Sequence, residues 1–288
     1  MPGVRGSTVV VATRNRRAGL LQTLDRLVEL PERPPVIVVD NGSSDGTPAA
    51  VRSRHPAVEV IALGENRAAL ARNVGTRAAR TPCVAFSDDD SWWESGALAK
   101  AETLFSVYSH LGLIAAKIVV EPGGALDPTC AAMASSPLGN DGNQLPGPRV
   151  LGFVACGSVV RRSAFLKAGG FSERLWFGGE ERLLAVDLAA AGWAASYVDG
   201  IVAHHEPASE RDPAERRRLL ARNALWFAWL RRPFPGATAA TLNVVRKAAT
   251  DASARAGIGD AFRGAPAVLR ERRPVSSDLE QAIRRVGL

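Results

Sequence analysis

The chain has 288 residues and a mass of 30.5 kDa, which suits one large α/β domain or two smaller ones. Hydrophobic residues make up 46% and charged residues 23% of the sequence, which excludes disordered and collagen-like chains. The formal net charge of +7 comes entirely from residues 211–288, which hold 16 basic and 7 acidic side chains. No basic stripe interleaved with aromatic residues accompanies this charge, so we expect no nucleic-acid partner.

The basic segment 211–288 has two interpretations. A charge run of this kind is usually a solvated helical face. Alternatively, the segment contacts an anionic lipid surface or an anionic acceptor, because opposite charges attract at such surfaces. We therefore keep peripheral membrane contact as an expectation for this tail.

The three cysteines, Cys83, Cys130 and Cys156, are odd in number and widely spaced. This spacing matches neither a metal site nor a disulfide framework, and it suggests a reducing compartment. No apolar stretch approaches the roughly 18 residues of a spanning helix, and the N-terminus lacks the apolar region of a signal peptide. We expect a cytoplasmic protein.

Strands and helices alternate in the first part of the chain. Short β-branched runs, typical of strands buried on both faces, predict strands at 8–13, 36–39, 58–62 and 83–86. Helices are predicted between them at 20–28, from about 48, and at 67–80. This alternation implies βαβ units, and hence an α/β fold with a mostly parallel sheet flanked by helices. Ligands of such sheets collect at the carboxyl ends of the strands.

The second part of the chain is less regular. Residues 121–149 are rich in Gly and Pro and predict a long loop, which in a compact domain is usually functional or disordered. The elements predicted after it are strands at 150–154 and 195–198 and helices at 162–168, 179–192 and 213–230, with further helix to the end. The chain is thus expected to end in a helical C-terminal extension.

Three adjacent aspartates, Asp88, Asp89 and Asp90, directly follow the strand that ends at Phe86. Adjacent carboxylates repel one another, and a bound Mg²⁺ or Mn²⁺ ion offsets that cost while sharing its coordination with substrate phosphate oxygens. The alternative is a solvated acidic turn that caps the next helix. We favour the metal site because the triplet lies at the edge of the sheet where ligands bind.

Two further acidic positions are candidates for chemistry. Asp40 ends the second predicted strand, where its carboxylate could accept hydrogen bonds from a base or a ribose, order the following turn, or do both. Glu180 and Glu181 follow two glycines and begin a predicted helix, whose dipole favours their ionised form. A carboxylate there suits a general base, and the alternative is simple charge complementarity at the helix terminus.

The order of these motifs resembles the family 2 glycosyltransferases of the GT-A fold, over roughly residues 7–206. The resemblance rests on the segments at 10–16, 38–47, 66–80, 86–90, 168–171 and 179–193. It implies a GT-A nucleotide-diphospho-sugar transferase with a mixed, mostly parallel sheet. It also implies a donor-binding half at 1–120 and an acceptor and catalytic-base half at 121–210, followed by the basic helical extension at 211–288.

The resemblance also implies roles for individual residues. The donor would be held by Thr13, Arg14, Asn15, Asp40, Asn41, Arg72, Asn73, Asp88 and Asp89. Asp88 and Asp90 stand in the place of the family's DXD motif and would hold a divalent metal, Mn or Mg. His204 or His205 would lie near it, and His204 is our choice; a structural hydrogen bond is the alternative. Glu181 stands where the family usually has an aspartate base, so either Glu181 or Glu180 would be catalytic.

We therefore expect a metal-dependent transferase that moves a sugar from a nucleotide-diphospho-sugar to an unidentified acceptor hydroxyl. By resemblance the reaction inverts the anomeric centre. The Gln-x-x-Arg-Trp motif of processive membrane synthases is absent, which favours a single addition. The alternatives are a sugar-phosphate nucleotidyltransferase, although the loop after the first strand has little Gly, and a non-catalytic protein that binds sugar nucleotides or glycans.

Overall fold

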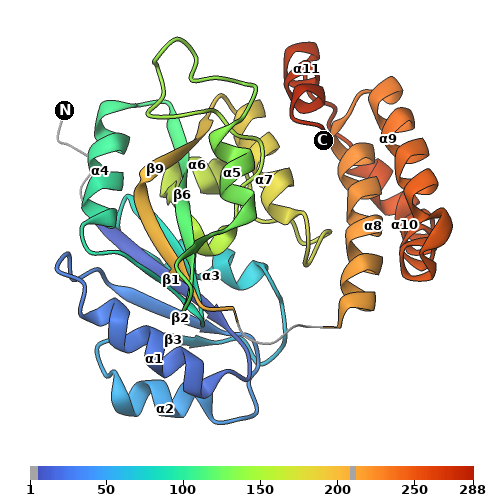
Figure 1. Cartoon of the computed structure of the whole chain (residues 1–288). Coiled ribbons are helices and arrows are strands. Elements are labelled where there is room, and N and C mark those ends of the chain that lie inside the picture. Colours follow the sequence, from blue (N-terminus) through green and yellow to red (C-terminus); the bar gives the residue numbers. More distant parts are fainter. Residues whose placement is uncertain (1–5, 208–211) are drawn as a thin grey trace.

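The computed structural model describes residues 6–207 and 212–288 (Figure 1). A mixed β-sheet with helices on both faces is followed by a group of helices that packs to one side of it. The predicted boundary between residues 210 and 211 lies outside the described residues. None of the described helices is both long and apolar enough to cross a bilayer.

One half of the sheet is parallel, as the alternation of strands and helices predicts. Its strands are β1 (Ser7–Thr13), β2 (Val36–Asp40), β3 (Glu59–Ala62) and β4 (Cys83–Asp88), in the order β3-β2-β1-β4. The helices between them are α1 (Arg17–Val28), α2 (Thr47–Arg54) and α3 (Leu70–Ala78). β1, β2 and β4 are almost wholly buried, because helices cover both faces of the sheet.

The other half of the sheet is mixed. It contains β5 (Ser91–Trp93), β6 (Leu111–Val120), β7 (Ala125–Leu126), β8 (Ser158–Arg161) and β9 (Ala194–His205). β8 joins β4 to β6 through antiparallel pairs, β6 and β9 are parallel, and β5 closes the edge. α4 (Ala97–Val107), α5 (Pro128–Ala134), α6 (Arg162–Lys167) and α7 (Glu180–Ala190) accompany these strands.

Two predictions for this half are wrong. The strand expected at 150–154 contributes no named strand; an isolated bridge joins Arg149 to Ser196, and the strand of this region is β8. The segment 121–149, predicted as loop throughout, contains β7 and α5. Asp127 caps α5 by accepting a hydrogen bond from the Thr129 backbone, so a short helix forms despite the surrounding Gly and Pro.

The helices divide the core into three clusters. Val9 and Val11 of β1 face α1, α2 and α4, whereas the alternate Val10 faces α3, α5, α6 and α7. α7 contributes to two of these clusters, because Leu184 packs toward the sheet and Leu183 packs toward the C-terminal helices. Those helices are α8 (Pro213–Arg231), α9 (Phe234–Lys247), α10 (Ala252–Arg270) and α11 (Ser277–Arg285). The first residues of α7 therefore lie between the two parts of the molecule.

Candidate functional site

Three polar strand ends meet at one edge of the sheet. Thr13 is paired with Asp40, and Ala12 is paired with Asp88, so the carboxyl ends of β1, β2 and β4 are in register. These strand ends and the loops after them carry most of the residues predicted to bind the donor, and α3 carries Arg72 and Asn73. The expected convergence at the strand ends is thus present in the structure.

Asp89 connects the end of β4 to β1 and α1 through hydrogen bonds. Its Oδ2 accepts a hydrogen bond from Thr13 Oγ1 at 2.8 Å, and its backbone carbonyl accepts one from Thr23 Oγ1 at 2.9 Å. Burial raises the pKa of the Asp89 carboxyl to about 6, although Thr13 and Arg16 oppose that shift. Because Thr13 and Asp89 bond to each other, both side chains join the predicted donor loop to the aspartate triplet.

Asp88 and Asp90 face different partners. The Asp88 carboxylate pairs with the guanidinium of Arg72, and its backbone N–H donates to Ser91 Oγ at 2.7 Å. Asp90 Oδ1 lies 3.5 Å from His205 Nε2, and Asp90 Oδ2 lies 3.8 Å from Arg16 Nη2. The hydrogen bond with Asp90 raises the pKa of His205, while burial lowers it.

His205, and not His204, lies beside the aspartates. Neighbouring residues of a strand point to opposite faces, and the two histidines end β9. His204 Nδ1 lies 3.0 Å from Glu121 Oε1, and its ring stacks on Trp92 with centroids 5.4 Å apart. The structure therefore replaces His204 with His205 as the histidine near the predicted metal carboxylates.

Asp40 offers an unused acceptor to a ligand. Its side chain is 2% exposed, and its Oδ2 accepts a hydrogen bond from the Ser43 backbone at 2.9 Å. Its Oδ1 is buried and has no hydrogen-bond partner among the described residues. A buried acceptor without a partner is costly, and a donor group of a bound base or ribose would relieve that cost.

The neighbouring loops are tied to one another through asparagines. Asn15, at a φ of 53°, accepts a hydrogen bond from the Ser44 backbone at 2.8 Å, and its own N–H donates to Ser43 Oγ. Asn41 accepts from the Arg67 backbone at 3.0 Å and donates to the Ala68 carbonyl at 3.3 Å. This turn before α3 explains why that helix begins at Leu70 rather than at residue 67 as predicted.

Asn73 holds a more distant segment. Its amide bonds both backbone groups of Phe171, donating to the carbonyl at 2.8 Å and accepting from the N–H at 2.9 Å. Asn41 and Asn73 were expected to contact the donor, but their amide groups bond to backbone and shape the surrounding loops. Arg14 is exposed at the end of β1, beside the same loops.

Arg72 connects the aspartates to the glutamate pair. It pairs with Asp88, and burial lowers its pKa while the charges of Asp88, Glu181 and Glu180 raise it, with a net rise. The charge of Arg72 in turn lowers the pKa of both glutamates. Residues from α3, the end of β4 and the start of α7 thus form one electrostatic cluster.

The start of α7 presents both glutamates to a cavity. Gly178 and Gly179 have φ values of 89° and 92°, a region that glycine enters at little cost, and they turn the chain into the helix. Glu180 is 4% exposed, and its Oε2 has no hydrogen-bond partner among the described residues. Burial raises the pKa of Glu180, and burial together with the charge of Glu180 raises the pKa of half-buried Glu181 to about 8.

That cavity measures about 170 Å³ and lies between the two parts of the molecule. Residues 177–181 line one side, and Arg216, Leu219 and Leu220 of α8 line the other. Glu181 therefore borders an open space between α7 and α8. Helix α8 belongs to the basic C-terminal segment, for which contact with an acceptor was one expectation, and it forms one wall of this cavity.

Another residue of α8, Asn223, supports the loop before Glu180. The buried Asn223 side chain donates to the backbone carbonyls of Leu175, Phe177 and Gly178 at 2.7–2.9 Å, and its Oδ1 accepts a hydrogen bond from Arg222 Nε at 2.9 Å. Sequence reasoning missed Asn223, whose only signal is a polar residue inside an apolar helical stretch.

Replacing Asn223 by Ala is expected to lower kcat by about ten- to a hundredfold while the KM for the donor stays unchanged, because a small displacement of a catalytic group is costly. The free energy of unfolding is also expected to fall by about 1–3 kcal/mol, which lowers the urea concentration at the unfolding midpoint. Steady-state kinetics would separate the two effects. Arg217→Ala, on the same helix in an exposed ion pair with Asp251, is the matched control; equal kinetics in both variants would contradict the positioning role.

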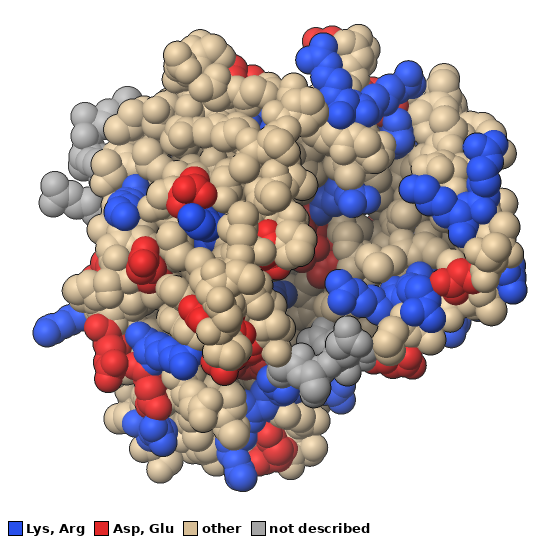
Figure 2. Space-filling view, in the orientation of Figure 1, with Lys and Arg blue, Asp and Glu red and all other residues tan. Residues whose placement is uncertain are grey.

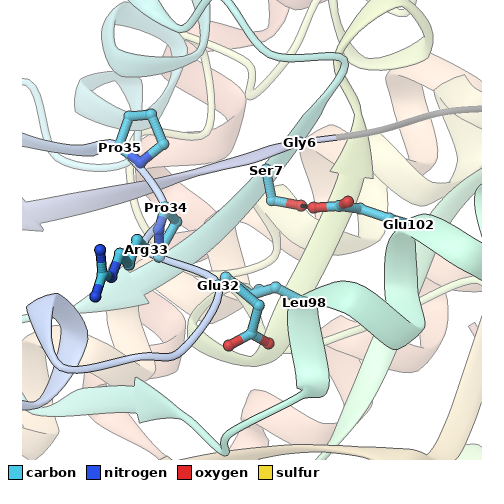
Figure 3. Close-up of a pocket in the computed structure, with 8 residues that line it drawn as sticks. All are labelled: Gly6, Ser7, Glu32, Arg33, Pro34, Pro35, Leu98 and Glu102. Carbon is cyan, nitrogen blue, oxygen red and sulfur yellow. Dashed lines mark hydrogen bonds between the residues drawn. The ribbon is translucent and has the colours of Figure 1, made fainter.

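A larger cavity of about 350 Å³ lies at the opposite end of the strands (Figure 3). Gly6 and Ser7 at the start of β1, Pro34 and Pro35 before β2, and Glu102 of α4 are among its lining residues, and Ser7 Oγ donates to Glu102 Oε1 at 2.8 Å. It is distant from the strand ends that carry the candidate site, so size alone does not locate the chemistry.

The side chains at the sheet edge supply only part of the ligand set of a divalent cation. Within the described residues, no group of three or more His, Cys, Asp or Glu side chains is arranged to hold a metal ion. Asp90 with His205, and Asp88 nearby, offer oxygen and imidazole ligands. This incomplete set suits Mg²⁺ or Mn²⁺, which commonly complete their coordination with one or two protein carboxylates, water and substrate phosphates.

Comparison with solved structures defines the fold. A mannosyltransferase from Pyrobaculum calidifontis, solved with GDP-Man and Mn²⁺, superposes with a TM-score of 0.59 over 97% of this chain and 85% of its own, at 20% sequence identity. The architecture is the GT-A fold of glycosyltransferases.

Sequence comparison gives the family. Residues 8–169 match the model of glycosyl transferase family 2, and the chain belongs to that family. It is 30% identical to an N-acetylglucosaminyl-diphospho-decaprenol L-rhamnosyltransferase of Mycobacterium tuberculosis, over 72% of this chain and 78% of that protein. It is also 32% identical to a pre-mycofactocin glycosyltransferase of the same species, over 84% of this chain but 48% of that protein. The chain is a glycosyltransferase, as its motifs predict.

Proposed function

We propose that this protein transfers a single sugar from a nucleotide-diphospho-sugar to an acceptor hydroxyl, with inversion at the anomeric carbon. The observation that carries the proposal is Arg72, which pairs with Asp88 and interacts electrostatically with Glu180 and Glu181. It brings the side chains suited to a diphosphate and those suited to a base to one site.

The donor would bind at the carboxyl ends of β1, β2 and β4. The unused Asp40 Oδ1 is suited to a donor group of the base or ribose, and the loops joined by Asn15 and Asn41 would enclose the nucleoside. The mannosyltransferase of the same fold was solved with a nucleotide sugar, which supports a donor of this class. Arg14 and Arg16 would add positive charge beside the diphosphate.

Asp88, Asp90 and His205 would hold a divalent ion together with diphosphate oxygens. When bound, such an ion stabilises the negative charge that develops on the leaving nucleoside diphosphate. Arg72 would act on the same charge, because its guanidinium is buried and already faces an anion. The Mn²⁺ in the mannosyltransferase structure supports the choice of metal.

Glu181 would take the proton of the acceptor hydroxyl as the new bond forms. It borders the 170 Å³ cavity where an acceptor can enter, and a raised pKa brings a carboxylate closer to the value that suits a base at neutral pH. The neighbouring Glu180 is more deeply buried and is the second candidate. Direct displacement needs no enzyme nucleophile, which agrees with inversion.

A donor screen tests the proposal. UDP-, GDP- and dTDP-sugars would be incubated with the protein, with Mn²⁺ and with EDTA, and the products would be separated by chromatography. We expect metal-dependent release of a nucleoside diphosphate from one donor. Release of pyrophosphate would instead indicate a nucleotidyltransferase, and binding without any product would indicate a non-catalytic protein.

A further inference from the structure

The C-terminal helices expose large apolar side chains to solvent. Phe234, Leu242 and Val245 of α9 and Phe262 and Leu269 of α10 are 74%, 62%, 44%, 55% and 51% exposed, respectively. We call these five residues the apolar face. Single exposed apolar residues need no explanation, but several on neighbouring helices mark a contact surface.

Residues of α9 and α10 meet around Trp229 of α8. The indole N–H of Trp229 donates to Thr241 of α9 at 3.0 Å, and its ring lies 5.2 Å from the ring of Phe262 on α10. Arg272 donates to the Trp229 carbonyl and lies over the Phe234 ring at 4.5 Å. Both helices therefore reach the same tryptophan, Phe262 directly and Phe234 through Arg272.

Basic residues follow three members of the apolar face in the sequence. Val245, Phe262 and Leu269 are each followed by an arginine: Arg246, Arg263 and Arg270. Among the described residues, Arg246, Lys247 and Arg270 have no ion-pair partner, whereas Arg263 pairs with Asp260. Figure 2 shows clusters of Lys and Arg on the surface of the C-terminal helices, at the right of the view.

We propose that the apolar face, with Arg246, Lys247 and Arg270, docks the protein on an anionic lipid bilayer. Amphipathic helices with aromatic and aliphatic residues beside arginine and lysine bind such surfaces through buried apolar area and attraction to anionic headgroups. A second copy of the chain fits less well, because a twofold interface places the same surface on both sides and would oppose like charges. None of these residues lines the cavity beside Glu181.

Vesicle co-sedimentation tests the proposal with the full chain. We expect the protein to sediment with vesicles of phosphatidylcholine and phosphatidylglycerol, not with phosphatidylcholine alone, and to dissociate as salt rises. The triple variant Arg246→Gln/Lys247→Gln/Arg270→Gln should lose on the order of a hundredfold in vesicle affinity, at about fivefold for each charge removed. Arg52→Gln/Arg77→Gln/Arg80→Gln, which neutralises three exposed arginines of the sheet domain, is the matched control and should bind as the parent does.

The apolar contribution has its own variant, Leu242→Ser/Leu269→Ser, which changes exposed side chains and should weaken binding to the mixed vesicles. Metal-dependent donor hydrolysis should stay at the parental rate in every variant, which separates this proposal from the proposed function. Parental vesicle affinity in both the triple variant and the serine variant would overturn the proposal. So would failure of the parent to bind mixed vesicles, or light scattering that shows a dimer dissociated by the serine substitutions.

Discussion

Glu181→Gln is expected to lower the rate of sugar transfer by about 10²–10⁴-fold, the range typical of a lost general base. The amide keeps the shape of the side chain but cannot accept the proton of the acceptor hydroxyl. Donor affinity, measured by calorimetry with Mn²⁺ present, should stay within a few-fold of the parent because Glu181 borders the cavity at α8 rather than the strand ends. Initial rates of nucleoside diphosphate release would give the size of the loss.

Glu180→Gln is the matched control, since it changes the adjacent carboxylate in the same helical turn. If only Glu180→Gln greatly lowered the rate of sugar transfer, Glu180 would be the base. If both variants reacted at the parental rate, neither glutamate of α7 would be the base. The pH profile adds a second readout. Because burial and the charge of Glu180 raise the pKa of Glu181 to about 8, the ionised base becomes more abundant as pH rises toward that value. The rate of the parent should therefore increase with pH across neutrality, and this increase should be absent in Glu181→Gln.

Asp90→Ala is expected to weaken Mn²⁺-dependent donor binding by about 10–100-fold or more, because it removes one of the two carboxylates proposed to hold the ion. The variant also frees His205 from its contact with Asp90. Calorimetric titration of the donor, with Mn²⁺ and with EDTA, would measure the effect. The loss should be confined to the titration with metal.

Asp25→Ala provides the control for removing an aspartate. Asp25 pairs with Arg54 on the surface, away from the aspartate triplet, so donor binding should not change. If Asp90→Ala bound the donor with parental affinity in the presence of metal, the carboxylate of Asp90 would have no part in the metal site.

Much of the donor side could be predicted from sequence. Strand–helix alternation is a local pattern, and the carboxyl ends of parallel strands necessarily meet at one edge, so Thr13, Asp40 and Asp88 could be placed together. No strand was predicted for residues 111–120, which form the ten-residue β6. An apolar run of this kind has no polar alternation, and periodicity alone does not separate a buried strand from a buried helix.

Three features of the site depended on tertiary structure. Asn41 and Asn73 were expected to face the donor, but their amides bond to backbone that comes from other parts of the chain. The histidine beside Asp90 depends on which face of β9 each residue occupies, and this follows from strand register. Asn223 meets the loop before Glu180 only because α8 packs there.

The sequence by itself determined the family, the parallel half of the sheet and the acidic motifs at its edge, because these depend on residue types at short spacing. The tertiary structure alone decided how Arg72 joins the aspartates to the glutamates and how α8 completes the cavity beside Glu181. Such contacts join segments far apart in the chain, and they form only when the packing of the core brings those segments together.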